Sequence, residues 1–122
     1  MSKNLEIALL LDFYGDMLTE KQRSMVDYYY NDDLSLAEIA ENEGISRQGV
    51  RDSIKRAEAQ MLEMEERLGL YRRFRRISDD VQQIWDLART IRSYSEFPGA
   101  PREIGESAAR IMALADMLQK TE

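Results

Sequence analysis

The fold is most constrained by one stretch, residues 34–57, which reads LSLAEIAENEGISRQGVRDSIKRA and predicts two short helices joined by a tight turn. Ser35 and Glu38 form an S-x-x-E capping box, in which each side chain satisfies a free backbone N–H at the helix start. Gly44 follows the first helix, where a residue at positive φ is needed to turn the chain. Apolar residues recur at helical spacing, and we expect them to be buried: Leu36, Ile39, Ala40, Ile45, Val50 and Ile54.

The second helix of this stretch should present a polar and mostly basic face. Ser46 can cap its N-terminus, and the side chains that point outward are Arg47, Gln48, Arg51, Asp52 and Lys55. Such a face, beginning at a helix N-terminus, is typical of the recognition helix of a helix-turn-helix. We predict that Arg47, Gln48 and Arg51 reach base edges, and that Lys55 and Arg56 contact phosphates. The alternative is a helix-turn-helix kept only as a scaffold, with a solvated basic face.

The balance of charge limits how this face could bind. The chain of 122 residues has a net charge of −6, yet residues 46–76 carry nine basic and five acidic side chains. The positive potential is therefore confined to the second helix and the segment after it. Asp52 and the acidic N-terminal third oppose the phosphate attraction that dominates affinity. Specific contacts without strong nonspecific binding would follow.

The composition argues against an enzyme. The chain has no cysteine and no histidine, which excludes disulfides, thiolate metal sites and the commonest general base. No nucleophile with an adjacent base, phosphate-binding glycine loop or metal-ligand cluster is recognisable. The acidic runs at 63–66 and 79–80 are interpreted as solvated helix faces. We therefore expect a non-enzyme without a cofactor or metal.

The same residues bear on the cellular compartment. Residues 1–11 lack the basic start and the small-residue cleavage site of a signal peptide. No apolar run approaches the ~20 residues needed to span a bilayer. These observations predict a cytoplasmic protein with no membrane partner.

The N-terminal segment predicts two more helices. Residues 5–18 are apolar on nearly every side of a helix, which predicts burial in the core or at a subunit contact. Thr19 and Gln22 form a second capping box that should open the next helix. This helix ends in three tyrosines, Tyr28–Tyr30, of which we expect one or two rings to pack and the remainder to be exposed.

The C-terminal part predicts an antiparallel helical hairpin. The helix from Ser46 should end at Leu68, with Gly69 as its break. A heptad seam then predicts one long helix over residues 70–94, and its members are Leu70, Phe74, Ile77, Val81, Ile84, Ala88 and Ile91. Trp85 lies beside the seam and should be half-buried. The prolines of residues 97–101 end this helix, and a second seam follows over residues 102–119: Ile104, Ala108, Ile111, Ala115 and Leu118. The fold class is therefore all-α, with a helix-turn-helix lobe (1–68) and a helical extension (69–122).

Several short motifs resemble known families. Residues 18–59 resemble the promoter-binding C-terminal domain of bacterial sigma factors, with LT-x-x-QR, L-x-x-IA and GISRQGV. The runs DFYGDMLTEKQR, YYYNDDLSLAEIAENEGISRQGVRDSIKR and LGLYRRF are more closely similar to the YlxM family of helix-turn-helix proteins, over about Leu9 to Phe74. That resemblance implies a cytoplasmic, non-enzymatic regulator linked to the signal recognition particle. It leaves DNA, particle RNA and a protein open as the ligand.

Two further surfaces extend these expectations. Residues 71–76 combine aromatic rings with four arginines, and Arg72 and Arg73 in particular could hold DNA or RNA; a solvated basic face is the alternative. The seams leave more apolar surface than a small hairpin hides, which predicts a homodimer. Its expected interface residues are Leu70, Phe74, Ile77, Val81, Ile84, Trp85 and Ile91. The same surface could instead bind a signal recognition particle protein or an RNA polymerase subunit.

Overall fold

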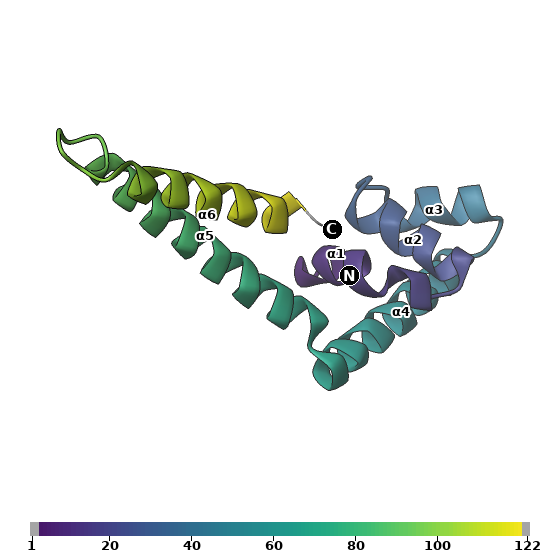
Figure 1. Cartoon of the computed structure of the whole chain (residues 1–122). Helices are drawn as coiled ribbons and strands as arrows, with labels where there is room; N and C mark the ends of the chain where they lie inside the picture. The colour runs from purple at the N-terminus through teal and green to yellow at the C-terminus, as the bar shows by residue number, and fades with distance from the viewer. Residues whose placement is uncertain (1–2, 121–122) are drawn as a thin grey trace. The chain divides into compact units, whose positions relative to one another are not determined.

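A computed structural model of the chain describes residues 3–120, and its regular elements are all helices (Figure 1). They are α1 (Glu6–Tyr14), the short 3-10 helix η1 (Gly15–Met17), α2 (Glu20–Tyr30), α3 (Leu36–Glu43), α4 (Arg47–Leu68), α5 (Leu70–Tyr94) and α6 (Arg102–Lys120). The all-α prediction is confirmed, with a helix-turn-helix followed by a helical hairpin. Within residues 3–120, no helix is long and apolar enough to cross a membrane.

The chain divides into two compact units, Met1–Arg72 and Arg73–Glu122. The predicted division into parts of residues 1–68 and 69–122 stays a prediction, because compactness does not test whether either part folds alone.

Local signals position the helices of the first unit as predicted. Thr19 and Ser35 each complete a capping box with the residue three positions on, at the starts of α2 and α3. Ser46 Oγ accepts a hydrogen bond from the N–H of Gly49 at 3.0 Å and caps α4. Gly44 ends α3 at φ 69°, and Gly69 ends α4 at φ 62°. These left-handed conformations favour glycine, since a Cβ there is strained.

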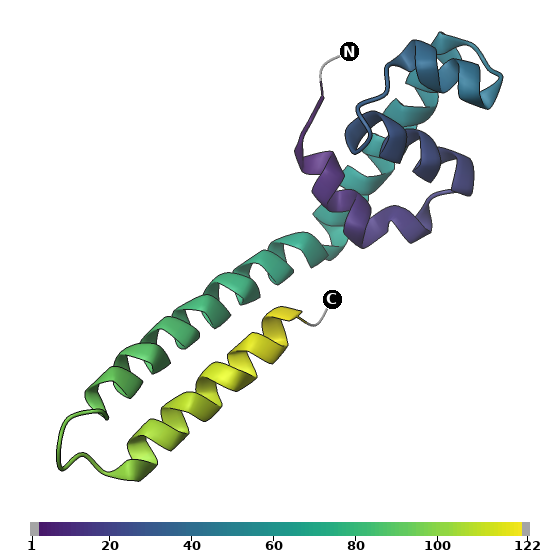
Figure 2. The ribbon, with the colours of Figure 1, turned by 90° about the horizontal axis from the view of Figure 1, so that it is seen from above.

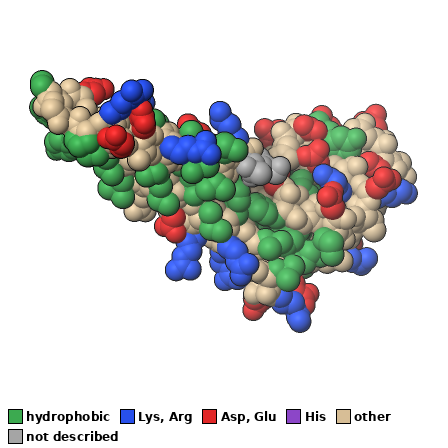
Figure 3. Space-filling model, in the orientation of Figure 1, with side chains coloured by type: hydrophobic (Ala, Val, Ile, Leu, Met, Phe, Trp, Pro, Cys, Tyr) green, Lys and Arg blue, Asp and Glu red, His purple; other side chains and the backbone are tan. Residues whose placement is uncertain are grey.

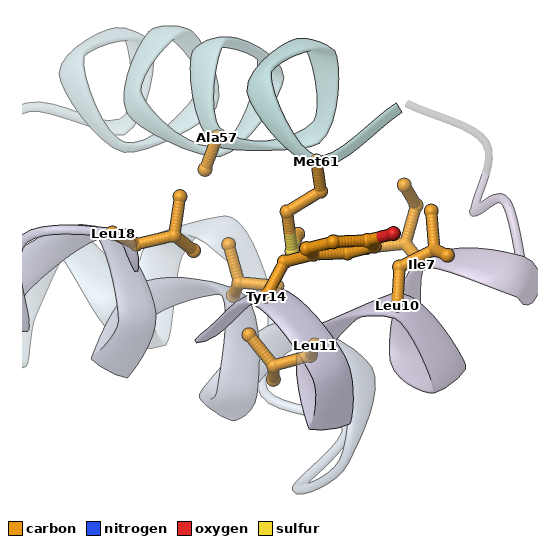
Figure 4. Close-up of a cluster of buried hydrophobic side chains, with 8 residues drawn as sticks. Ile7, Leu10, Leu11, Tyr14, Leu18, Ala57 and Met61 are labelled. Carbon is orange, nitrogen blue, oxygen red and sulfur yellow. The ribbon is translucent and has the colours of Figure 1, made fainter. Parts of the chain in front are cut away.

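Helix α4 is the centre of the first unit and packs against α1, α2 and α3. Two apolar clusters line it. The larger, drawn in Figure 4, joins α1, η1 and α2 to the middle of α4 and consists of Ile7, Leu10, Leu11, Tyr14, Leu18, Val26, Ala57 and Met61. The second lies under the helix-turn-helix and consists of Met25, Tyr29, Ile39, Ala40, Val50 and Ile54. Both clusters anchor α4 along its length.

The structure corrects three expectations about this core. The N-terminal helix ends at Tyr14 rather than Leu18, and only one of its faces is buried, since Leu9 is 45% exposed. Ile45 does not plug the core, because it is 44% exposed. Its Cδ1 lies over Gly49 in the first turn of α4, where a Cβ on that glycine would be only 3.6 Å away. The tyrosine triplet packs more than expected, since Tyr29 is buried and its two neighbours are half-buried.

The second unit is the antiparallel hairpin of α5 and α6, which lie side by side in both views (Figure 2). The long helix over residues 70–94 and the break over 97–101 are confirmed. Gln119 Nε2 donates a hydrogen bond to Gln82 Oε1 at 3.0 Å across the pair. Near the loop, a Cβ on Gly105 would lie 2.7 Å from Ser95 Oγ, so the helices approach closely there. Trp85 is half-buried, as predicted.

Candidate nucleic-acid interface

The exposed face of α4 begins directly after the turn at Gly44. Val50 and Ile54 are fully buried and fix the rotation of α4 about its axis. The five polar residues that the sequence assigned to the outer face are exposed, and so is the expected phosphate contact Arg56: Arg47, Gln48, Arg51, Asp52, Lys55 and Arg56. The face therefore exists as predicted, over the first three turns of the helix.

Some side chains of this face already form hydrogen bonds or ion pairs within the chain, and others do not. Gln48 Nε2 donates a hydrogen bond to Asp52 Oδ1 at 2.9 Å, one helical turn away. Lys55 Nζ lies 3.6 Å from Glu58 Oε2. Arg47, Arg51 and Arg56 make no side-chain hydrogen bond or ion pair with any residue between 3 and 120. Their guanidinium groups are available to an external anion or base edge.

A groove of about 410 Å³ runs beside α4, between it and the start of α2. Asp52 and Arg56 line it from α4, and Lys21 lines it from α2. In the described part of residues 1–45, the other two basic side chains are paired, Lys3 with Asp33 and Arg23 with Asp16. Lys21 has no such partner. Sequence reasoning missed Lys21, although a lone lysine two positions after a capping threonine would have been the signal.

The predicted arginines at the start of α5 are not part of the face of α4. Helix α4 is 22 residues long, or about 33 Å, and Arg72 follows its far end. Arg72 is also engaged: its Nε donates to Glu65 Oε2 at 3.1 Å, and its Nη2 donates to the Glu65 carbonyl at 3.0 Å. Arg73, Arg75 and Arg76 are exposed and make no ion pair within residues 3–120.

Glu65 is the centre of a buried polar cluster that sequence reasoning missed. It was assigned to a solvated run, but it is only 6% exposed. Its Oε1 accepts hydrogen bonds from the Tyr14 hydroxyl at 2.7 Å and the Tyr71 N–H at 3.0 Å, and its Oε2 accepts from the Arg72 N–H at 3.2 Å. The Leu70 N–H donates to the Tyr14 hydroxyl at 3.1 Å. Together these groups satisfy the free N–H donors in the first turn of α5, the work of an N-cap.

The cluster also shifts two pKa values. Burial by itself would raise the pKa of Glu65, but the hydrogen bonds from Tyr14, Tyr71 and Arg72 and the charge of Arg72 lower it below the ordinary glutamate value. Burial, followed by the hydrogen bond to Glu65, raises the pKa of Tyr14. The structure therefore favours an ionised Glu65 beside a neutral Tyr14.

A similar pair lies one heptad earlier in α4. The Tyr30 hydroxyl donates to Glu58 Oε1 and accepts from the Asn4 N–H at 3.2 Å. Burial, followed by the hydrogen bond to Glu58, raises the pKa of Tyr30. Both carboxylates have structural partners, and residues 3–120 contain no group of three acidic side chains that could hold a metal ion.

The residues expected at the oligomer interface differ in how far the hairpin covers them. Val81 is buried within the second unit and contributes to the packing of the hairpin itself. Phe74, Ile77, Ile84 and Ile91 remain between about a third and a half exposed, and so does Leu70 at the end of the first unit. No partner chain tests these assignments, and they stay predictions.

Comparison with known proteins identifies related chains. A family model described as UPF0122, "Putative helix-turn-helix protein, YlxM / p13 like", matches residues 1–96. The motif resemblance is thereby confirmed and extended from Phe74 through α5.

Three relatives, each named a UPF0122 protein, show the extent of the similarity. The one from Acetivibrio thermocellus is 57% identical over 74 residues, which are 61% of this chain and 63% of that protein. The one from Halalkalibacterium halodurans is 49% identical over 84 residues, 69% of this chain and 77% of that protein. The one from Thermoanaerobacter pseudethanolicus is 43% identical over 110 residues, 90% of this chain and 94% of that protein.

Proposed function

This chain belongs to the UPF0122 family of YlxM/p13-like helix-turn-helix proteins, and on that premise we propose that it is a regulatory protein that binds nucleic acid through α4. The observation that carries the proposal is the set of exposed guanidinium groups on Arg47, Arg51 and Arg56, which are unpaired within residues 3–120. They belong to the first three turns of a helix whose opposite side is anchored by Val50 and Ile54. Arg47 and Arg51 are one turn apart, which suits adjacent contacts along a groove.

Double-stranded DNA is the ligand that this geometry supports best. The major groove of B-DNA admits an α-helix, whereas the major groove of A-form RNA is too deep and narrow for side chains to read. Lys21, across the groove from Arg56, suits a phosphate flanking the site. The net charge of −6 predicts weak binding to nonspecific DNA, because the phosphate attraction is small.

Signal recognition particle RNA is the second candidate, and it rests on a different segment. Arg73, Arg75 and Arg76 are exposed on α5 and unpaired within residues 3–120. Arginines beside an aromatic ring suit single-stranded loops, where bases can stack. This reading would link the chain to protein targeting, as the family resemblance implies. Under this reading, α4 would serve as a scaffold.

The test is a fluorescence-anisotropy titration of the full chain against promoter duplex DNA and against particle RNA, each at two salt concentrations. We expect saturable binding to DNA that weakens with salt. Arg51→Ala should weaken it by roughly 5- to 100-fold, the range of one good contact to a base edge. Arg92→Ala is the matched control, since Arg92 is an exposed arginine of the second unit.

Each result is decisive for one reading. Loss of DNA binding in Arg51→Ala but not in Arg92→Ala supports α4 as the reader. If RNA binding is unaffected by Arg51→Ala but is lost when the charge of Arg73 is reversed, then α5 rather than α4 is the binding element. Flat titrations against both ligands would overturn nucleic-acid binding and favour a protein of the particle or of RNA polymerase.

A further inference from the structure

The hairpin of α5 and α6 leaves large apolar side chains uncovered along one side. Figure 3 shows hydrophobic side chains gathered along this hairpin on the face in view. Ile84 is 48% exposed and Leu87 is 66% exposed. The exposed Phe97 and Met117 lie in the loop and on the outer side of α6, while the exposed residues at positions on this side are Ile77, Ile84, Leu87, Ile91, Tyr94, Ile104, Ile111, Leu114 and Leu118. This set is called the apolar face below.

The reason for the exposure lies in the residues that the two helices bury between them. The buried members of the seams are small, namely Val81, Ala88, Ala108 and Ala115. The contacts of Gln82 with Gln119 and of Ser95 with Gly105 set the register, which puts the isoleucines level with alanines. An alanine brings the helices close but is too short to cover the isoleucine opposite. Each isoleucine is therefore only half covered within the hairpin.

The heptad register puts these residues on a single side. The buried residues occupy position a of each heptad, and the isoleucines occupy position d. In an antiparallel pair, the d positions of both helices face the same side of the pair. The neighbouring g positions face this side too, and Leu87, Tyr94 and Leu114 occupy them, which makes the apolar face wider. Ile91, Ile104 and Ile111 line one shared groove of about 310 Å³, which is direct evidence that the two rows meet.

The opposite side of the hairpin carries polar residues together with two half-buried apolar ones, Trp85 and Met112. Gln82 and Gln119 are hydrogen-bonded there. Trp85 occupies the same side in the heptad register, away from the apolar face, and its place in the predicted interface stays a prediction. The opposite side exposes fewer large apolar side chains than the apolar face does.

We propose that the apolar face binds the apolar face of a second copy of this chain, giving a four-helix bundle about a two-fold axis. Both helices repeat isoleucine or leucine at the same seven-residue spacing, so the face has matching layers for a copy of itself. The charged side chains that flank it in the register are mixed in sign: Arg76 and Asp80 on α5, and Glu103 and Arg110 on α6. Such a rim imposes no like-charge penalty on self-association and does not select a strongly charged partner.

The size of the face fits a dimer. Residues 77–94 of α5 extend over about 27 Å, and two helices are about 20 Å wide. This projected footprint of roughly 500 Å² is of the same order as the ~800 Å² that each partner buries in a standard interface. It also lies at the upper end of the apolar patches that a monomer normally exposes.

The test measures the mass of the full chain in solution by light scattering and sedimentation over a range of micromolar concentrations. We expect a particle of twice the chain mass of 14.2 kDa. The variant Leu87→Lys/Leu114→Lys places two charges on the apolar face without touching the buried alanines, and we expect it to be a monomer. Asp79→Lys, which adds a lysine on the opposite side, is the matched control and should remain a dimer.

Folding is monitored separately in the same samples. Helix content by circular dichroism and the fluorescence of Trp85, the chain's single tryptophan, should be unchanged in the monomeric variant. A wild-type monomer at every concentration would overturn the proposal and indicate that another part of the chain or another protein covers the face. A dimer that survives Leu87→Lys/Leu114→Lys with intact helix content would also overturn it, because the contact would then lie elsewhere.

Discussion

The Tyr14 hydroxyl donates a hydrogen bond to Glu65 Oε1 at 2.7 Å and joins the end of α1 to the last turn of α4, 51 residues away in sequence. Both side chains are buried, and the same tyrosine oxygen accepts the N–H of Leu70. This single contact ties together α1, α4 and the first turn of α5. Together with the Tyr30–Glu58 pair, it adds polar contacts to the apolar core of the first unit.

Removing that hydroxyl should destabilise the chain. Tyr14→Phe leaves the Leu70 N–H without its acceptor and takes one donor from a buried carboxylate. We expect the free energy of unfolding to fall by about 1–3 kcal/mol, the cost of unsatisfied buried groups, as measured by urea denaturation. Tyr28→Phe is the control, because Tyr28 is only half-buried, and it should change stability by less than ~0.5 kcal/mol. Equal effects of the two substitutions would contradict a special role for Tyr14.

The pH dependence of stability should report Glu65. Its folded pKa is lowered, so its ionised form stabilises the fold above the unfolded glutamate pKa of about 4.3. This contribution is lost as the pH falls below that value and through the folded pKa. Glu65→Gln should therefore be less stable than wild type at pH 7, and the gap should narrow towards pH 3. A gap that stays constant over this range in urea titrations would show that Glu65 is not ionised in the fold.

Arg72 and Arg73 should behave differently although they are adjacent. Arg72 donates two side-chain hydrogen bonds to Glu65, whereas Arg73 makes no ion pair within residues 3–120. Arg72→Ala should lower the free energy of unfolding by about 1 kcal/mol, a value kept small because the arginine is partly solvated. Arg73→Ala should change stability by less than ~0.5 kcal/mol and act only on ligand affinity. Thermal melts of both variants measure the structural role, and anisotropy titrations measure the role in binding. A clear loss of stability in Arg73→Ala would contradict the assignment of a binding role alone to Arg73.

Lys21 should contribute to nucleic-acid binding without contributing to sequence preference. It lines the groove beside Arg56 and is unpaired within residues 3–120. Lys21→Ala should weaken binding to all duplexes by a similar factor and reduce the slope of log affinity against log salt by about 1. Lys120→Ala, at the end of α6, serves as the control. If Lys21→Ala instead altered the preference among duplex sequences, the lysine would be contacting bases.

Much of the fold could be predicted because its signals are local. The capping boxes at Thr19 and Ser35 act within four residues, and Gly44 and Gly69 are needed for the conformation of their own backbone. Helical spacing likewise depends on helix geometry alone: it predicted the course of α5 from its heptad seam and the exposure of Arg47 and Arg51 from the buried residues Val50 and Ile54. The exposed polar face of α4 could be assigned for the same reason.

Tertiary structure decided the residues whose surroundings come from distant parts of the chain. Glu65 belongs to an acidic run in sequence, and only the approach of Tyr14 and the start of α5 makes it a buried acceptor. Ile45 is apolar and lies in the turn between two core-lining helices, yet it is 44% exposed and lies over Gly49 rather than in the core. Lys21 lies beside α4 only because α2 packs against α4.

The hairpin shows the same division. The sequence by itself determined two amphipathic helices and the spacing of their apolar rows, because periodicity is a property of each helix. Only the packing decided that Val81 and the alanines lie inside while Ile84 and Leu87 remain exposed. The physical reason is that burial depends on the length of the side chain opposite, and a helix does not carry that information in its own sequence.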